Sequence, residues 1–204
     1  MNNIKFEKGR IISFTDAVFS IAMTLLVLEI AVPSTKQLID YGFLTVLSGL
    51  TANFIGLVVS FFVTALYWIA HLRAMQYVTD FDTKLLWLNI LMLLFIVLLP
   101  FSTAFYVNSF NLTGPFVFYC FNLSAIGLFN FLIIRYVVIK EKGANGLTPI
   151  IGQWEKLRAL NSFLVWTLAG IVAFIFPFIA KFIFLLIFVF QAIINYRFKK
   201  KLGK

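Results

Sequence analysis

An acidic residue inside an apolar segment is the clearest chemical signal in this sequence. Asp16 lies within the hydrophobic run that follows Arg10, and Glu29 lies near the end of the same run. Burial of a carboxylate in a bilayer costs on the order of several kcal/mol, so such a residue needs a polar partner or a functional role. Asp16 therefore belongs either to a structural hydrogen-bond network or to a path for ions or protons.

The candidate partners of Asp16 come from three apolar segments. Arg10 lies about a turn and a half away on the same helix. Trp68 and His71 end the second apolar segment, and Asn89 lies just inside the third. We expect these groups to form a buried polar cluster near one end of the molecule. The only histidine is either a proton relay or an oriented structural donor, and the structural role is favoured.

The composition excludes most soluble proteins and most enzymes. The 204 residues are 62% hydrophobic and only 12% charged, whereas soluble domains are about a quarter charged. With one Cys, the chain cannot form an internal disulfide or a zinc site that needs two cysteines. An intramembrane enzyme needs His, Asp or Ser clustered at the midplane, and no such cluster is found. We therefore predict an all-α integral membrane protein without enzymatic activity and without a cofactor.

Hydrophobic segments of about 20 residues predict six transmembrane helices in a single domain, 1–204. A turn at Asn108–Pro115 divides the long uncharged run between Lys84 and Arg135. Pro33 closes the first segment, and Pro177 marks a tight turn between the last two. The six predicted spans are 11–32, a helix within 41–70, 85–107, 115–134, 158–181 and 181–197.

The cations are distributed very unevenly over the two sides of this predicted bundle. Six spans place both termini on one side, and that side holds all but two of the 17 Lys and Arg residues. Only Lys36 and Lys181 fall on the other side. This bias predicts cytoplasmic termini in a multi-pass protein of the cell membrane. The positive charge is thus a topology signal and does not indicate nucleic-acid binding; the basic tail 197–204 anchors the last helix or binds acidic lipid headgroups.

The first helix carries an apolar stripe beside its small and polar residues. At about 100° per residue, Ile21, Leu25 and Leu28 share one sector, and Thr24 lies at its border. This sector either lines a conduit or packs against the second or sixth helix. In the second segment, Gly42, Gly49 and Gly56 recur every seven residues and predict a face for close helix packing.

The segment 10–30 resembles the first helix of the transmembrane protein 175 family of potassium channels. The family pattern Arg-x-x-x-Phe-[Ser/Thr]-Asp is present as Arg10, Phe14, Thr15 and Asp16, with Thr in place of the commoner Ser. The following residues, 21–30, read Ile-Ala-Met-Thr-Leu-Leu-Val-Leu-Glu-Ile. Further similarity lies in Trp68, His71 and the sequence Leu98-Leu99-Pro100-Phe101.

The resemblance implies a prokaryotic member with one six-helix unit that assembles as a homotetramer. It implies that the first helices of four subunits line a potassium-permeable pore without a Thr-Val-Gly-Tyr-Gly filter. The constriction would be formed by Ile21, Leu25 and Leu28, with Thr24 beside them. It also implies that Arg10, Thr15, Asp16 and His71 form a structural network near the cytoplasmic end, which Trp68 and Asn89 would join.

Several interpretations stay open at this stage. Glu29 either lies at the outer mouth, where it attracts cations, or pairs with a neighbouring helix. A proton conductance is an alternative function because Asp16 and His71 can titrate. An ion-coupled carrier is a further alternative, although the midplane of the first helix is unbroken, whereas carriers use interrupted helices there. The expected partners are other copies of the chain, membrane lipids, and potassium and other monovalent cations.

Overall fold

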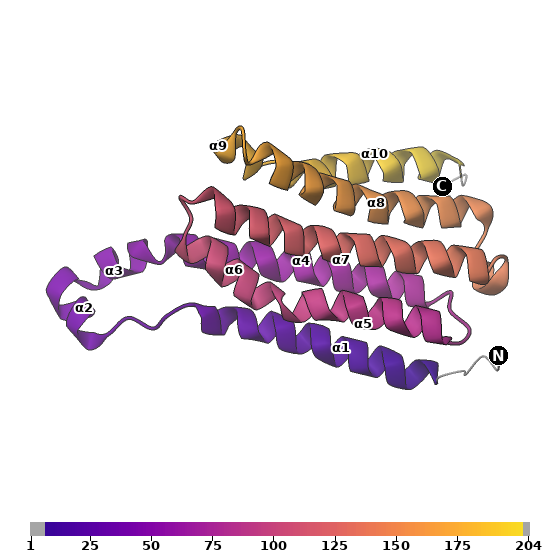
Figure 1. The fold of residues 1–204 in the computed structure, drawn as a ribbon, viewed down its shortest axis with the longest axis horizontal. Coiled ribbons are helices and arrows are strands. Elements are labelled where there is room, and N and C mark those ends of the chain that lie inside the picture. Colours follow the sequence, from indigo (N-terminus) through magenta and orange to yellow (C-terminus); the bar gives the residue numbers. More distant parts are fainter. Residues whose placement is uncertain (1–6, 202–204) are drawn as a thin grey trace.

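Long apolar helices account for most of the chain. The computed structural model describes residues 7–201, and every regular element in that range is helical. In chain order the elements are α1 (Lys8–Leu25), η1 (Leu26–Glu29), α2 (Thr35–Tyr41), α3 (Phe43–Gly49), α4 (Thr51–Met75), α5 (Thr83–Val97), α6 (Leu99–Asn108), α7 (Thr113–Lys140), η2 (Ala144–Gly146), α8 (Pro149–Val172), α9 (Pro177–Ala180) and α10 (Leu185–Lys201). Figure 1 shows them as an elongated bundle, and the start of α1 and the end of α10 lie at the same end of it.

Four segments are long and apolar enough to cross a membrane. They are Lys8–Glu29, Thr51–Met75, Thr83–Asn108 and Thr113–Lys140. The third combines α5 and α6, which meet at Leu98 because Pro100 has no N–H for the helical hydrogen-bond ladder. Helices α8 and α10 run alongside these four (Figure 1). With its apolar composition, this fold is that of a multi-pass membrane protein.

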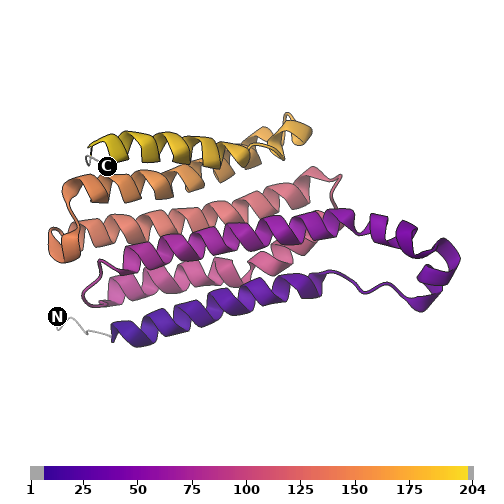
Figure 2. The same cartoon turned by 180° about the vertical axis from the view of Figure 1, so that it is seen from behind.

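The second predicted span starts within the expected range 41–70 but extends beyond it, to Met75. Residues before Thr51 form α2 and α3, which project beyond the rest of the bundle (Figure 2). Gly42 has a φ of +76° and therefore separates α2 from α3. The prediction that Gly42, Gly49 and Gly56 form one packing face is wrong. Of the three, only Gly56 allows a close approach, since a Cβ there would collide with the Val107 side chain, whereas the other two glycines have open space.

Helix α7 is the centre of the bundle, and it packs against α8 on one side and against α5 and α6 on the other. Its buried face includes Leu123, Ile126 and Ile133. Gly127 brings the α7 and α8 backbones together, because a Cβ there would lie 3.0 Å from the Phe163 backbone. Helix α8 begins at Pro149, nine residues before the predicted span, with the Thr148 hydroxyl accepting the Ile151 N–H.

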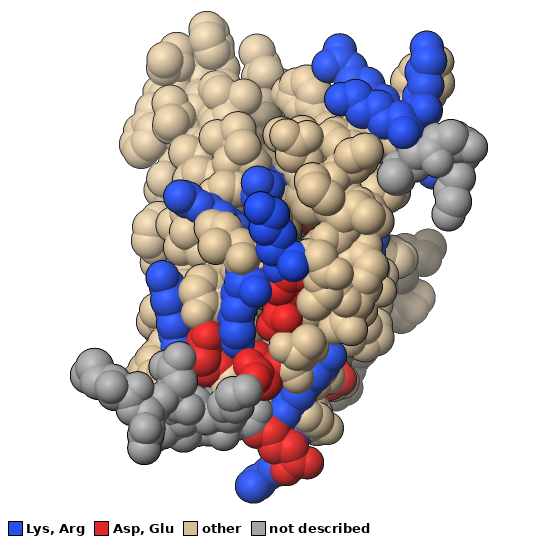
Figure 3. Space-filling view, turned by 90° about the vertical axis from the view of Figure 1, so that its right-hand side faces the viewer, with Lys and Arg blue, Asp and Glu red and all other residues tan. Residues whose placement is uncertain are grey.

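Charged side chains hold together the end of the bundle that carries the termini (Figure 3). At the end of α7, Lys140 forms ion pairs with Asp80 at 2.9 Å and with Asp82 at 3.2 Å. Burial alone would raise the pKa of Asp82, but hydrogen bonds from Tyr136 and the Leu85 N–H, together with Lys140, hold that pKa below its usual value. Lys5, Lys204 and the last three residues of the predicted basic tail, 202–204, lie outside the described residues.

Candidate functional site

The first helix has one buried face and one exposed face. Thr15, Phe19, Ala22 and Leu26 are buried at helical spacing, and α1 packs against α4, α5 and α6. The predicted stripe lies on the other face: Ile21 is 56% exposed, Leu25 38% and Leu28 73%. These three side chains are therefore not an in-chain packing face against the second or sixth helix.

The exposed stripe continues across a change in helix type. The α-helix ends at Leu25 and a 3-10 turn follows, in which three residues complete one turn. Leu28 therefore lies directly in line with Leu25, and the stripe from Ile21 to Leu28 is about 12 Å long. The Thr24 hydroxyl donates to the Ile21 carbonyl at 2.8 Å, so this polar group on the same face is satisfied by its own backbone.

A hydrogen-bond chain connects α1, α4 and α5. His71 Nε2 lies 2.9 Å from Asn89 Oδ1, and Asn89 Nδ2 donates to Thr15 Oγ1 at 2.8 Å. Because an amide oxygen only accepts, His71 carries its proton on Nε2. Its Nδ1 is buried and has no partner. The three side chains are at most 1% exposed, so this chain is a fully buried connection between the three helices.

Asp16 forms a separate link between α1 and α4. Trp68 Nε1 donates to Asp16 Oδ1 at 2.8 Å, so the partly buried carboxylate has an indole partner. Asp16 is not directly hydrogen-bonded to His71 in the described part of the chain. Arg10 is exposed and has no hydrogen bond or ion pair within residues 7–201. The structure thus brings together five of the six predicted network residues, in two branches, and leaves Arg10 outside both.

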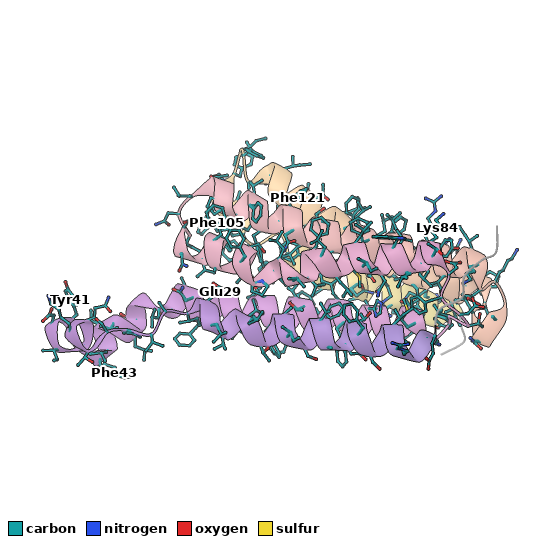
Figure 4. The ribbon with its side chains drawn as sticks, turned by 60° about the horizontal axis from the view of Figure 1, so that its bottom comes forward. Glu29, Tyr41, Phe43, Lys84, Phe105 and Phe121 are labelled. Carbon is teal, nitrogen blue, oxygen red and sulfur yellow. The ribbon has the colours of Figure 1, made fainter. Side chains whose placement is uncertain are left out.

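Glu29 lies at the end of α1 and η1 that is remote from the termini. Figure 4 shows it far from Lys84, which marks the other end of the bundle, and on the side from which Tyr41 and Phe43 of the α2–α3 arm project. Its side chain is exposed and has no ion pair within residues 7–201. The alternative in which Glu29 pairs with a neighbouring helix of its own chain is therefore not observed.

A second polar cluster was not anticipated from the sequence. Thr103 Oγ1 donates to Ser60 Oγ at 3.0 Å, and Ser60 Oγ lies 3.0 Å from the Tyr119 hydroxyl. This cluster connects α4, α6 and α7 in the other half of the bundle. Isolated Ser and Thr residues in otherwise apolar segments were the available signal, but nothing in their spacing indicates which of them meet.

Comparison with known proteins finds a family that resembles the first half of the chain. Residues 10–100 match the family described as "Endosomal/lysosomal potassium channel TMEM175". The resemblance to the transmembrane protein 175 family is thereby confirmed. The matched range contains α1 from Arg10 onward, α4 and α5, and hence both branches of the polar network.

Individual proteins that resemble the chain are named potassium channels. A potassium channel of Streptomyces collinus is 37% identical over 98 residues, which are 48% of this chain and 47% of that protein. A potassium channel of Chamaesiphon minutus is 38% identical over 98 residues, 48% of each chain. The match therefore spans about half the length of these two relatives. A potassium channel of a Chryseobacterium species is 28% identical over 96% of this chain and 97% of its own.

A solved structure shares the fold over nearly the whole chain. The crystal structure of a lysosomal potassium-selective channel TMEM175 homolog from Chamaesiphon minutus superposes with a TM-score of 0.78. It is 23% identical, and the match covers 94% of this chain and 97% of that one. The TMEM175 family and the relatives named above are described as ion channels and not as enzymes.

Proposed function

We propose that this protein is a potassium-permeable cation channel in which four copies surround a pore lined by α1. The observation that carries the proposal is the exposed apolar stripe of Ile21, Leu25 and Leu28, which its own chain leaves without a packing partner. One such helix cannot enclose a conduit, so copies related by a rotation axis are needed. The names of the bacterial relatives, each called a potassium channel, support potassium as the permeant ion.

The proposed constriction is apolar and about 12 Å long. Rings of Ile21, Leu25 and Leu28 offer no ligands to a cation, so an ion loses part of its hydration shell when it passes. Potassium holds water less tightly than sodium, and such a neck therefore favours potassium modestly. Hydrophobic constrictions also gate by dewetting. The exposed carboxylates of Glu29 at the outer mouth would raise the local cation concentration.

The proposed topology has six membrane crossings, with both termini in the cytoplasm and the protein in the cell membrane. The arrangement of α8 and α10 beside the four apolar segments supports the count. The start of α1 and the end of α10 lie at one end of the bundle (Figure 1), where charged side chains gather (Figure 3), and this supports the orientation. In this proposal no cofactor takes part, and the partners are other copies of the chain, lipids and monovalent cations.

The test is the reversal potential of the purified protein in a planar bilayer, with potassium on one side and sodium on the other. We expect unitary current steps and a reversal potential displaced toward the potassium equilibrium potential. A macroscopic flux without unitary steps would indicate an ion-coupled carrier instead. A monomer or a closed dimer in mild detergent, measured by native mass spectrometry, would eliminate the four-helix pore.

Proton permeation is the second candidate function. Relatives from Danio rerio and Homo sapiens are named endosomal/lysosomal proton channels, and the human protein is 28% identical over 129 residues, which are 62% of this chain and 25% of that protein. The buried His71–Asn89–Thr15 chain is the feature here to which protons could bind. A reversal potential that follows an imposed pH gradient at equal potassium would favour this function, and His71→Gln would then reduce the current.

A further inference from the structure

A cavity of about 160 Å³ lies on the side of α7 and α8 that α1 does not cover. Its walls come from α4, α7, α8 and α10. Three apolar residues of this lining are substantially exposed, namely Leu66 and Ile69 on α4 and Phe188 on α10. The cavity therefore opens between α4 and α10, toward the region that lipid tails occupy when the bundle is in a membrane.

Two buried polar atoms in the lining have no partner in the described part of the chain. Trp166 is 2% exposed and its Nε1–H donates to no acceptor, while Asn130 is 2% exposed and its Oδ1 accepts no hydrogen bond. The neighbouring hydroxyls are satisfied, because Ser162 donates to Tyr67 and Tyr67 donates to the Leu123 carbonyl. An unpaired buried polar group costs about 1–3 kcal/mol. Both atoms have almost no accessible surface, so a small side-chain movement must turn them toward an occupant that accepts from Trp166 and donates to Asn130.

The end of the cavity nearer the chain termini carries a net positive charge. Its charged lining residues are Arg73, Arg158 and Glu155. Arg158 Nη1 lies 3.6 Å from Glu155 Oε1, which leaves one positive charge uncompensated. The Nε atoms of both arginines are buried without an acceptor. This arrangement favours an occupant with a single negative charge.

The spacing of these groups distinguishes an extended ligand from a small ion. Arg158 and Trp166 are separated by eight residues of α8, which is about 12 Å along the helix. A free phosphate ion cannot contact both groups, whereas an amphiphile can place an anionic group at one and an ester carbonyl at the other. The cavity, at about 160 Å³, is too small to enclose acyl chains. Acyl chains would therefore leave through the opening beside Leu66 and Phe188.

We propose that this cavity binds a phospholipid whose phosphodiester carries one negative charge, such as phosphatidylglycerol. The phosphate lies between Arg73 and Arg158, an ester carbonyl accepts from Trp166, and a headgroup or glycerol hydroxyl donates to Asn130. The site lies on the opposite side of the bundle from the α1 stripe, and the proposal does not depend on ion conduction.

The test is native mass spectrometry of the purified, delipidated full chain in mild detergent, titrated with phosphatidylglycerol or with zwitterionic phosphatidylcholine of the same acyl chains. We expect phosphatidylglycerol to bind at least about tenfold more tightly, because hydrogen bonds to charged groups are the stronger class. Trp166→Phe should weaken binding about threefold to tenfold, and Arg73→Gln about tenfold or more.

Lys200→Gln is the matched control, because it removes a cation from the same end of the bundle but does not line this cavity. It should leave binding unchanged. Equal binding of the two lipids, or an equal loss with Lys200→Gln and Arg73→Gln, would overturn the proposal in favour of diffuse attraction. Displacement of the lipid by millimolar inorganic phosphate would instead assign the site to a free anion.

A neighbouring subunit is the competing occupant of the opening. In that case the oligomer would bind no phosphatidylglycerol and Arg73→Gln would reduce the oligomeric fraction, which would also overturn the proposal. Because Arg73 is only partly buried, Arg73→Gln keeps the test decisive if Trp166→Phe does not fold.

Discussion

Replacement of Asn89 by leucine should lower the free energy of unfolding by more than the two hydrogen bonds of Asn89 contribute, because it also leaves His71 unpaired. Asn89→Leu keeps a side chain of similar size but removes the bonds to His71 Nε2 and Thr15 Oγ1. Thr15 still donates to the Ile11 carbonyl at 2.9 Å. His71, whose Nδ1 has no partner, would then have neither ring nitrogen hydrogen-bonded.

The expected magnitude follows from these contacts. Interhelical hydrogen bonds in membrane proteins contribute about 0.6 kcal/mol each on average, and a buried unsatisfied group costs about 1–3 kcal/mol. We therefore expect Asn89→Leu to lower the free energy of unfolding by about 2–4 kcal/mol. The double variant His71→Phe/Asn89→Leu removes the orphaned group as well, so it should be less destabilised than the sum of the two single variants by about 1–2 kcal/mol.

The assay is equilibrium unfolding of the purified protein in dodecyl maltoside by increasing mole fractions of SDS, followed by tryptophan fluorescence. Asn53→Leu is the matched control, because Asn53 also forms an interhelical amide bond, to Asn108 Oδ1 at 2.9 Å, but at an exposed position. It should cost less than about 0.5 kcal/mol. The reasoning is refuted if Asn89→Leu is as mild as this control, or if the effects of the two network substitutions simply add.

Three further predictions concern the neck, the core and the charged end. Ile21→Asn should wet the proposed constriction, raising unitary conductance and lowering the potassium-to-sodium permeability ratio in bilayer recordings; an unchanged ratio in a stable variant would argue against the neck. Gly127→Ala should destabilise by about 1–3 kcal/mol in SDS unfolding, because the α8 backbone blocks its Cβ, whereas Gly114→Ala, which has open space, should be neutral. The Asp82 carboxyl has a lower pKa in the folded chain than in the unfolded chain, so its ionised form stabilises the fold above the unfolded pKa, and this stabilisation is lost as pH falls through the folded pKa. Between pH 7 and pH 3, the melting temperature should therefore fall less for Asp82→Asn than for wild type.

Much of the fold could be predicted because a membrane segment is defined by its composition. The first four segments were predicted near their observed positions, since the long uncharged runs admit few alternatives. The start of α4 was left open within 41–70, because apolar composition continues through Gly42, where a positive φ interrupts the helix. The sequence pattern located the Ile21 stripe but did not reveal whether that stripe or the opposite face packs against the bundle.

The sequence predicted which residues belong to the polar network better than it predicted the hydrogen bonds between them. Thr15, Asp16, Trp68, His71 and Asn89 do lie together, because few polar groups are available at that depth. Arg10 is instead exposed, and Trp68 is the partner of Asp16 Oδ1. The cavity near Trp166 could not be found from sequence. Its lining residues come from helices far apart in the chain and follow no short spacing rule.

The position of both chain ends at one end of the bundle has a practical consequence for counting subunits. The last described residue of one copy and the first of another leave their bundles on the same side, so a flexible linker can join two copies head to tail without inverting either. Two such tandem fusions would supply the four stripes of the proposed assembly. Ile21→Asn placed in the first, the second or both halves of the fusion would introduce the change in a known number of stripes. The dependence of the permeability ratio on that number would then show whether the stripes act independently or as one ring.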